Sequence, residues 1–328
     1  MKCLCLAVPK KMAEKIRKRL IDKNLMIEGV KVKRKKGYVY FPIKRSSIDI
    51  EECKICEEEF EEIKKRSYED ILKERGISID SISIDFIGDI AIIRLRDEEK
   101  AEEVAKAIME ANKHVKTVFL DKGVKEDYRV RDIQFIAGER STETIHTEYG
   151  IKMKVDVSKV YFSPRLAEER MRVTRQIDKN EVIIDMFAGV APFSLIIAKF
   201  AKPKKVYAID KNEFAVKYAR ENVKMNKVEE IIEVIRGDAK EVIEMLPKAN
   251  HIIMNLPHKS FEFLPVAIKK GEILHYYEIV EREKLNERIE EIKKLAKEMG
   301  HKIEIKNVRK VGSYSPSKDK FGMELCVK

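Results

Sequence analysis

A glutamate flanked by arginines lies in the segment VYFSPRLAEERMRV, which covers residues 160–173. Arg165, Glu169 and Arg172 are four and three residues apart, so a helix places them roughly on one face. A carboxylate held in this way can act as a general base, and Arg165 and Arg170 can hold it or the carboxylate of a ligand. A surface helix with ordinary ion pairs explains the same spacing equally well.

Four apolar segments in the C-terminal half of the chain each run into a polar or small-residue turn. The polar residues of these turns are Asp185, Asp210, Asp238 and Asn255. Ligands of parallel α/β sheets bind outside the carboxyl ends of the strands. A carboxylate in the second turn can accept hydrogen bonds from a ribose diol, and one in the third can accept from an adenine amino group. Together the turns predict a nucleoside cofactor, although each aspartate alone could be a helix N-cap.

The first of these turns has the sequence DMFAGVAPFS and contains a single glycine, Gly189. Small residues in such a turn let the backbone approach a ligand closely. The turn does not match GxGxxG, and the chain has no Walker lysine loop, so the sequence argues against a cofactor with phosphates. S-adenosylmethionine contains an adenine, a ribose and a sulfonium and no phosphate, and it is therefore the predicted cofactor.

The fourth turn belongs to MNLPHKSFEFL, residues 254–264, and contains Asn255, Leu256 and Pro257. The proline fixes the turn, and the asparagine amide offers a donor and an acceptor to the edge of a nucleobase. Enzymes that methylate exocyclic amines usually carry an aromatic residue after such a proline, where this chain has His258. The motif therefore indicates methylation of another kind of nitrogen, or only a turn that caps the next helix.

The apolar pattern of residues 159–328 predicts the elements that position these side chains. Apolar runs alternate with helical patterns and short loops, which is typical of a doubly wound, mostly parallel, Rossmann-like α/β sheet. Strands are expected at 181–187, 205–210, 231–236, 250–255, 272–280, 302–309 and 322–328. Helices are expected at 192–200, 212–226, 238–246, 259–269 and 281–299.

Two smaller α+β domains are expected before this sheet, at residues 1–65 and 66–158. Between positions 10 and 36 there are twelve Lys or Arg residues and three Asp or Glu residues. The basic charge continues from an expected helix into an expected hairpin, which favours an RNA-binding surface over a solvated helix face. With residues 159–328, the sequence therefore predicts three domains.

The whole chain of 328 residues carries 68 Lys and Arg against 57 Asp and Glu, a net charge of +11. Such an excess is typical of proteins that bind nucleic acid, and the Lys/Glu-rich composition is typical of heat-adapted proteins. Because no apolar run of 18 residues is present and charge begins soon after Met1, we expect no membrane span, no signal peptide and a cytoplasmic protein. The five cysteines, including Cys53 and Cys56, lack a zinc-site spacing, so no metal is expected.

Several motifs resemble, in this order, those of the archaeal tRNA (guanine-37-N1)-methyltransferases: YFSPRLAEER, DMFAGVAPFS, YAID, IMNLPHKSFEFL and LHYY. The segment YRVRDIQFIAGERSTETIHTEYG is similar to the one that precedes them in that family. The resemblance implies a class I methyltransferase domain after two small RNA-binding domains, and methyl transfer from S-adenosylmethionine to N1 of guanosine 37. It also implies that the N-terminal domain contacts the outer corner of tRNA, while the other two hold the anticodon stem-loop.

The resemblance implies roles for individual residues. Glu169 matches the general base, Asn255 the residue that contacts the guanine edge, and Arg129 the arginine that steadies the base. Tyr161 matches a position beside the pocket. One departure is Ala191, where most members have glycine, and we expect its methyl group to be tolerated if φ is negative there. The positions that match the cofactor site are Arg165, Arg170, Phe187, Ala188, Gly189, Val190, Asp210, Lys211, Asp238, Ala239, Asn255, Leu256 and Pro257.

The expected chemistry starts from the proton on guanine N1, because this nitrogen becomes a nucleophile only as that proton leaves. The site therefore needs a base near N1 and a donor near O6, where negative charge develops. Glu169 is the expected base, and Arg129 is the expected donor. We expect burial against the flipped base, with the apolar Phe162, Leu166 and Met171 beside it, to raise the pKa of Glu169 above its usual value of about 4.3.

Two other functions are alternatives at this point. A wybutosine-pathway enzyme acts on the same tRNA position with the same cofactor, by aminocarboxypropyl transfer or by methylation of the intermediate imG-14. A non-catalytic RNA-binding protein that keeps the cofactor fold is the second alternative, which the combined presence of Glu169, Asp210, Asp238 and Asn255 disfavours. The missing aromatic residue after Pro257 argues against a DNA amino-methyltransferase. We expect a monomer that binds neither DNA nor a membrane.

Overall fold

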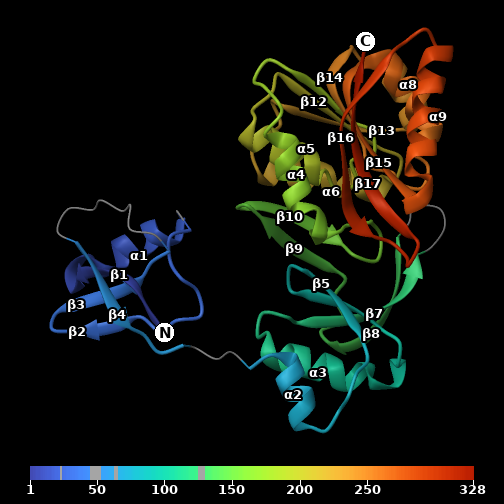
Figure 1. The fold of residues 1–328 in the computed structure, drawn as a ribbon. Coiled ribbons are helices and arrows are strands. Elements are labelled where there is room, and N and C mark those ends of the chain that lie inside the picture. Colours follow the sequence, from blue (N-terminus) through green and yellow to red (C-terminus); the bar gives the residue numbers. More distant parts are fainter. Residues whose placement is uncertain (23, 45–52, 63–65, 125–129) are drawn as a thin grey trace. The chain divides into compact units, whose positions relative to one another are not determined.

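The computed structural model describes the chain except for residues 23, 45–52, 63–65 and 125–129 (Figure 1). The chain divides into two compact units, Met1–Ile77 and Ser78–Lys328. The expected division into three domains, with boundaries at 65/66 and 158/159, stays a prediction. No helix of the described part is long and apolar enough to cross a membrane.

The N-terminal unit is built on an antiparallel four-stranded sheet with the strand order β2-β3-β1-β4. Helix α1 buries Ile16 and Leu20 in a cluster with Leu6 and Phe41 of the sheet. This burial turns the basic side chains of α1 to solvent, as the amphipathic pattern requires. The elements are β1 (Lys2–Pro9), α1 (Ala13–Asp22), β2 (Lys33–Lys35), β3 (Tyr38–Pro42), β4 (Lys54–Glu59) and α2 (Tyr68–Glu74).

Two cysteines of this unit lie directly opposite each other on neighbouring strands. Cys5 of β1 pairs with Cys56 of β4, and their sulfur atoms are 2.8 Å apart in a hydrogen bond. Both are free thiols, and burial raises the pKa of Cys5 far above its usual value. Among the residues that the structure describes, no cluster of three or more His, Cys, Asp or Glu side chains could hold a metal ion.

The C-terminal unit begins with a second four-stranded sheet, in the order β5-β6-β7-β8, followed by a separate hairpin of β9 and β10. Gly88 makes the tight turn between β5 and β6 with a φ of 57°. A Cβ atom at this glycine would lie 2.1 Å from Thr144 Oγ1 of β9, so only glycine permits this close approach of turn and hairpin. The elements are β5 (Ile82–Ile87), β6 (Ile90–Leu95), α3 (Ala101–Ala111), β7 (Thr117–Val124), β8 (Arg131–Gly138), β9 (Glu143–Glu148) and β10 (Ile151–Asp156).

A seven-stranded sheet forms the rest of the unit, in the order β13-β12-β11-β14-β15-β17-β16. The first five strands of this order are parallel, and β17 and β16 continue the sheet in antiparallel pairing. Its strands are β11 (Val182–Asp185), β12 (Lys205–Asp210), β13 (Ile232–Arg236), β14 (Ala249–Met254), β15 (Gly271–Glu281), β16 (Ile303–Ser313) and β17 (Lys318–Val327). The prediction of a doubly wound, Rossmann-like sheet is confirmed, and each expected strand is present.

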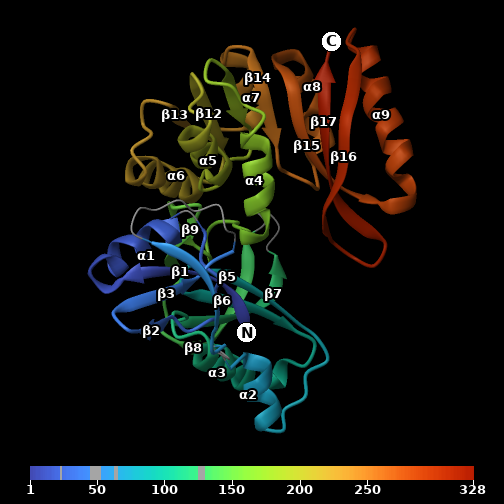
Figure 2. The same ribbon diagram turned by 60° about the vertical axis from the view of Figure 1, so that its left-hand side comes forward.

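Helices cover both faces of this sheet because successive apolar residues of each strand point to opposite sides. Ile183 packs with α5 and α6 on one face, whereas Ile184 packs with α7, α8 and α9 on the other. Figures 1 and 2 show α4 and α5 on one side of the strands and α8 and α9 on the other. The helices are α4 (Ala167–Thr174), α5 (Pro192–Phe200), α6 (Glu213–Met225), α7 (Ala239–Met245), α8 (Ser260–Lys270) and α9 (Leu285–Glu298).

The order of the parallel strands reverses at β11. The chain moves from β11 to β12 and β13 on one side, and then crosses to β14 and β15 on the other. The loops that leave β11 and β14 therefore diverge and open a crevice at their carboxyl ends, where ligands of such folds bind.

The turn after β11 ends at Ala191, whose backbone is left-handed, with φ 67° and ψ 36°. The condition under which we expected an alanine here to be tolerated, a negative φ, is therefore not met. Ala191 is fully buried and precedes Pro192, the first residue of α5. An L-residue in this conformation carries a steric cost of roughly 1–2 kcal/mol that glycine avoids. The helix begins from a strained residue in this chain.

This strain predicts the relative stability of two matched glycine variants. Ala191→Gly and Ala198→Gly each remove one buried methyl group, but Ala198 lies inside α5. We expect Ala191→Gly to lower the free energy of unfolding less than Ala198→Gly, by about 2–3 kcal/mol. The former relieves left-handed strain, and the latter adds the cost of a glycine inside a helix. Urea denaturation of both variants measures the difference. A difference of only about 1 kcal/mol, the helix cost alone, would show that Ala191 is not strained.

Candidate active site

The carboxyl ends of four neighbouring parallel strands, β13, β12, β11 and β14, meet along one side of the sheet. Asp210, at the end of β12, accepts hydrogen bonds from the Gly189 backbone N–H at 2.7 Å and the Asn212 N–H at 2.9 Å. Burial raises the pKa of Asp210, although these N–H groups oppose the shift. The Asp210 carboxylate therefore links the turn after β11 to the turn after β12. Gly189 itself has φ 56°, a conformation suited to glycine.

Asp185, at the end of β11, is a buried carboxylate with spare hydrogen-bonding capacity. Its Oδ2 accepts from Ser194 Oγ at 2.8 Å. Its Oδ1 is buried and has no hydrogen-bond partner among the described residues. Burial raises the pKa of Asp185 to about 7. An unpaired buried oxygen is costly until a donor reaches it, so this position suits a ligand with an ammonium group, which S-adenosylmethionine has.

The turns after β13 and β14 contain further predicted cofactor residues. One oxygen of Asp238 accepts from the Lys240 N–H at 2.9 Å and caps α7. The N-cap interpretation is therefore correct for this oxygen, and the second oxygen can still serve a ligand. The ring of Phe187 packs edge-on against Phe263 of α8, with centroids 4.8 Å apart. Of the other predicted cofactor residues, Ala188, Val190 and Ala239 are buried, Leu256 and Pro257 are half-buried, and Lys211 is exposed.

Glu169 of α4 lies in a cluster of donors that come from distant parts of the chain. Arg172 donates to both carboxylate oxygens at 3.0 Å, and the Tyr277 hydroxyl donates to Oε1 at 2.5 Å. Arg309 of β16 donates through Nε to Oε2 at 3.1 Å and also bonds Oε1. Both arginines also bond Glu324 of β17. The cluster therefore joins α4 to β15, β16 and β17.

Without a bound base, the pKa of Glu169 is low. Burial raises it, but hydrogen bonds from Arg309, Arg172 and Tyr277 outweigh burial and lower the pKa to about 2. The expected rise on burial against the flipped base stays a prediction. In this structure the side chain is ionised over the whole neutral and mildly acidic range.

Asn255 is linked to this cluster by two intermediate side chains. Lys320 of β17 donates to Asn255 Oδ1 at 2.8 Å. The same ammonium group lies 5.3 Å from the centroid of the Tyr277 ring, within cation–π range. Since Tyr277 donates to Glu169, one continuous path of contacts connects Glu169, the predicted general base, with Asn255, which is predicted to contact the edge of the guanine. The structure thus brings Glu169 and Asn255, 86 positions apart, into one site.

Arg165 is held by residues of β5. It donates to Asp85 Oδ1 and to Ser83 Oγ, both at 2.6 Å. Arg131, the first residue of β8, donates to the other oxygen of Asp85 at 2.5 Å, so Asp85 joins the two arginines. Arg129 lies outside the described residues, so its predicted role stays a prediction.

Two further predicted residues lie at the edge of the site. Arg170 is only 2% exposed, and it donates to both oxygens of Glu148 and to the Ser163 carbonyl at 2.6–2.8 Å. Its two terminal nitrogens are therefore engaged by the protein, whereas its buried Nε has no hydrogen-bond partner among the described residues, and its predicted cofactor contact stays a prediction. Tyr161 is 43% exposed, and its carbonyl oxygen lies 3.7 Å from where a Cβ atom at Gly189 would be. Tyr161 thus lies next to the first turn.

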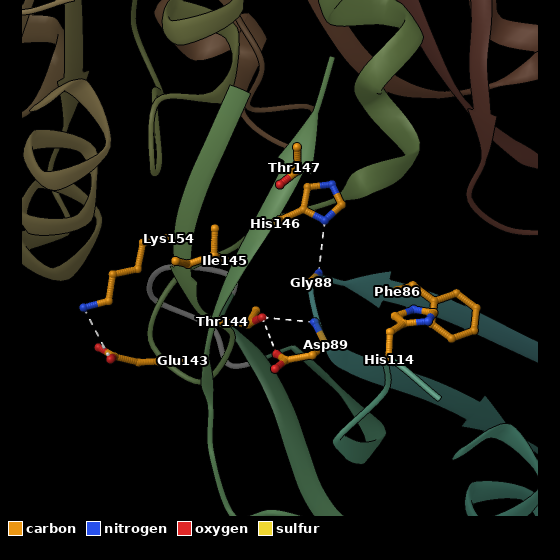
Figure 3. Close-up of a pocket in the computed structure, with 10 residues that line it drawn as sticks. All are labelled: Phe86, Gly88, Asp89, His114, Glu143, Thr144, Ile145, His146, Thr147 and Lys154. Carbon is orange, nitrogen blue, oxygen red and sulfur yellow. Dashed lines mark hydrogen bonds and ion pairs between the residues drawn. The ribbon is translucent and has the colours of Figure 1, made fainter. Parts of the chain in front are cut away.

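A hollow of about 740 Å³ lies apart from these residues. It is lined by residues of the β5–β6 turn and of β9, among others (Figure 3). Its polar groups bond one another: the Gly88 N–H donates to His146 Nδ1, and Thr144 bonds the side chain and backbone of Asp89. None of the predicted catalytic or cofactor residues lines it.

Sequence reasoning missed Lys320, Arg309 and the function of Tyr277. Tyr277 lies within the LHYY motif, which marked the segment without indicating a role. Lys320 and Arg309 lie on antiparallel strands rich in charged residues, and no spacing distinguishes them from exposed neighbours. Only the register of β16 on β17 brings them to the site.

Comparisons with known proteins show to which family this chain belongs. Residues 144–305 match the family "TRM5/TYW2 methyltransferase domain", residues 5–51 match "tRNA methyltransferase 5 N-terminal domain", and residues 80–142 match "TYW2 N-terminal domain". The chain is 40% identical over 336 residues to the tRNA (guanine(37)-N(1))-methyltransferase Trm5b of Pyrococcus abyssi, covering 99% of both proteins. It is 36% identical to a tRNA(Phe) (4-demethylwyosine(37)-C(7)) aminocarboxypropyltransferase of Methanocaldococcus jannaschii, over 70% of this chain and 92% of the other.

A solved structure also resembles the whole chain. The crystal structure of Trm5b from Pyrococcus abyssi superposes with a TM-score of 0.72 and 38% identity, covering 99% of both chains. The full-length match distinguishes this relative from the aminocarboxypropyltransferase, which matches only part of the chain. The chain therefore belongs to the archaeal tRNA (guanine-37-N1)-methyltransferase family, within the TRM5/TYW2 group of class I methyltransferases.

Proposed function

We propose that this protein is a methyltransferase that transfers a methyl group from S-adenosylmethionine to N1 of guanosine 37 in tRNA, giving m1G37. The main support is the contact path from Glu169 through Tyr277 and Lys320 to Asn255, beside the four turns that suit a nucleoside cofactor. A carboxylate and an amide in one site can accept the N1 proton and contact the edge of the same base.

The proposed cofactor residues have distinct tasks. Asp210 and Asp238 would accept hydrogen bonds from the ribose and the adenine, and Asp185 Oδ1 would accept one from the amino group. The backbone of the first turn, at Gly189, allows a close approach, and Leu256 and Pro257 form the wall next to Asn255. When bound, S-adenosylmethionine supplies an electrophilic methyl group on its sulfonium.

Glu169 would accept the N1 proton, but its present contacts make it a weak base. A carboxylate with a pKa of about 2 takes up a proton poorly at neutral pH. We therefore propose that the bound guanine displaces at least one of the donors from Arg172, Arg309 and Tyr277. Displacing a donor removes a stabilising hydrogen bond from the ionised carboxylate and raises its pKa towards the operating pH.

Asn255 and Arg129 would contact the guanine itself. Asn255 can contact the edge of the guanine, and Lys320 fixes the orientation of its amide oxygen. Arg129 would donate to O6, where negative charge develops as N1 loses its proton. Both roles follow from the family relationship and stay proposals.

The proposed partner is tRNA, held by two surfaces. The exposed basic side chains of the N-terminal unit on α1 would contact the outer corner of the molecule, and the C-terminal unit would hold the anticodon stem-loop. A monomeric, cytoplasmic protein belongs to the same proposal.

The reaction itself is tested with cofactor labelled in either of two positions. With an unmodified tRNA transcript, we expect label from the methyl group to reach the RNA and label from the carboxyl carbon to stay behind. Nucleoside mapping should then find 1-methylguanosine at position 37. Transfer of the carboxyl label would instead indicate aminocarboxypropyl transfer, and no transfer of either label would indicate a non-catalytic RNA-binding protein.

Replacing the proposed base separates chemistry from binding. We expect Glu169→Gln to lower the single-turnover rate constant by about 10²- to 10⁴-fold, the usual contribution of a general base, while affinity for S-adenosylmethionine is retained. The adjacent Glu168 is exposed, and Glu168→Gln serves as the matched control that should leave the rate unchanged. A normal rate in Glu169→Gln would remove Glu169 from the mechanism.

The N-terminal basic surface is expected to contribute affinity without chemistry. The variant in which Lys15, Lys18 and Arg19 of α1 all become Gln should bind tRNA more weakly. The slope of log K against log salt should become shallower by about 0.7–0.9 for each phosphate that the variant no longer neutralises. The rate at saturating tRNA should not change.

The matched control changes Lys293, Lys294 and Lys297 of α9 to Gln, which removes the same charge from another exposed helix. Equal salt slopes for the two triple variants would contradict a specific role for α1.

A further inference from the structure

The hairpin of β16 and β17 contacts the Asn255 loop at two separate points. Lys320 of β17 donates to Asn255 Oδ1 at 2.8 Å. Tyr314, in the turn between the strands, lies against His258, with ring centroids 5.2 Å apart and an interplanar angle of 71°. His258 follows Pro257 directly. The hairpin thus touches both ends of the segment from Asn255 to His258.

Backbone hydrogen bonds from the end of β15 hold both the Asn255 loop and the turn between β16 and β17. The Ile279 N–H donates to the Pro257 carbonyl at 2.9 Å, and the Arg282 N–H donates to the Ser317 carbonyl at 3.2 Å. Within the turn, the Tyr314 N–H donates to the Lys318 carbonyl at 3.0 Å. The backbones that carry His258 and Tyr314 are therefore held in place relative to each other without help from either ring.

Tyr314 has no evident part in the core. Its side chain is 55% exposed, and His258 is exposed as well. A large aromatic ring that is held in a fixed turn and left open to solvent is suited to stacking on a nucleobase. The nearby Lys320 adds a positive charge that favours an RNA ligand.

We propose that Tyr314, backed by His258, is the stacking wall for the target guanine when that base leaves the RNA stack. This inference rests on the proposed function and adds a substrate-binding residue to it. The position after Pro257, where exocyclic-amine methyltransferases carry an aromatic residue, holds His258, and the aromatic surface comes from Tyr314 on another hairpin. Stacking on this wall offsets the cost of removing the base from the helix.

The test measures tRNA affinity of full-length variants with S-adenosylhomocysteine present, so that no reaction occurs. We expect Tyr314→Ala and Tyr314→Leu to raise the Kd of a transcript with guanosine 37 by about 5- to 150-fold, the loss of one base–aromatic stack, and Tyr314→Phe to keep the wild-type Kd. A transcript with an abasic site at position 37 should bind wild type and all variants with the same Kd, because no base is left to stack.

The matched control is Tyr149→Ala. Tyr149 is also an exposed tyrosine in a hairpin turn, 47% exposed and packed edge-on against Phe200. Its replacement should leave both Kd values unchanged. Thermal unfolding and cofactor affinity of the Tyr314 variants should equal those of the wild type, since the ring is exposed.

Two results would overturn the stacking wall: a wild-type Kd for Tyr314→Ala on the guanosine transcript, or the same loss on the abasic transcript, which would indicate a contact away from base 37. A different result would refute the proposed function. If wild type produces no 1-methylguanosine from the unmodified transcript, the activity is refuted, whereas the Kd comparison still reports whether Tyr314 stacks on that base.

Discussion

The buried charge of Glu169 is the constraint on which the site depends. A carboxylate that is removed from water is costly unless donors surround it, and a buried pair that loses one partner is strongly destabilised. The donors to Glu169 come from α4, β15 and β16. Because they come from three elements, the helix before the sheet and the antiparallel end of the sheet must keep a fixed relative position for the charge to be tolerated.

This requirement gives the two antiparallel strands a function beyond closing the sheet. The pairing of β16 with β17 shifts register twice, between Ile305 and Asn307 and between Lys310 and Gly312. Arg309 lies between these irregularities and reaches Glu169, while Lys320, paired with Gly312, reaches Asn255. Bulges of this kind change the direction of side chains near functional sites. The proposed cofactor residues thus lie at the parallel strands, whereas the contacts that hold Glu169 and Asn255 come in large part from the antiparallel ones.

The sequence predicted the parts of the molecule that local patterns determine. Strand and helix periodicity predicted the sheet, and the polar turns at Asp210 and Asp238 lie at one edge of it because each turn follows its own strand directly. The contacts of Glu169 could not be predicted in this way. Its partners Tyr277 and Arg309 are 108 and 140 positions away, so its pKa depends on strand register across the sheet. The apolar sequence neighbours of Glu169 did not indicate its low pKa in the free protein.

The chemistry of a ring nitrogen explains why the site is divided in this way. An exocyclic amine keeps its proton until it attacks, so a compact motif of Asn, Pro and an aromatic ring can serve it. Guanine N1 must lose its proton first, so the site needs a proton acceptor in addition to Asn255, and an ionised Glu169 is the proposed one. An ionised carboxylate in a buried site needs cationic partners. Arg172 and Arg309 meet that need in the free protein. In the proposed mechanism the guanine competes with these arginines. The cluster would then tie proton acceptance to substrate binding, since Glu169 would become a stronger base only when its donors are displaced.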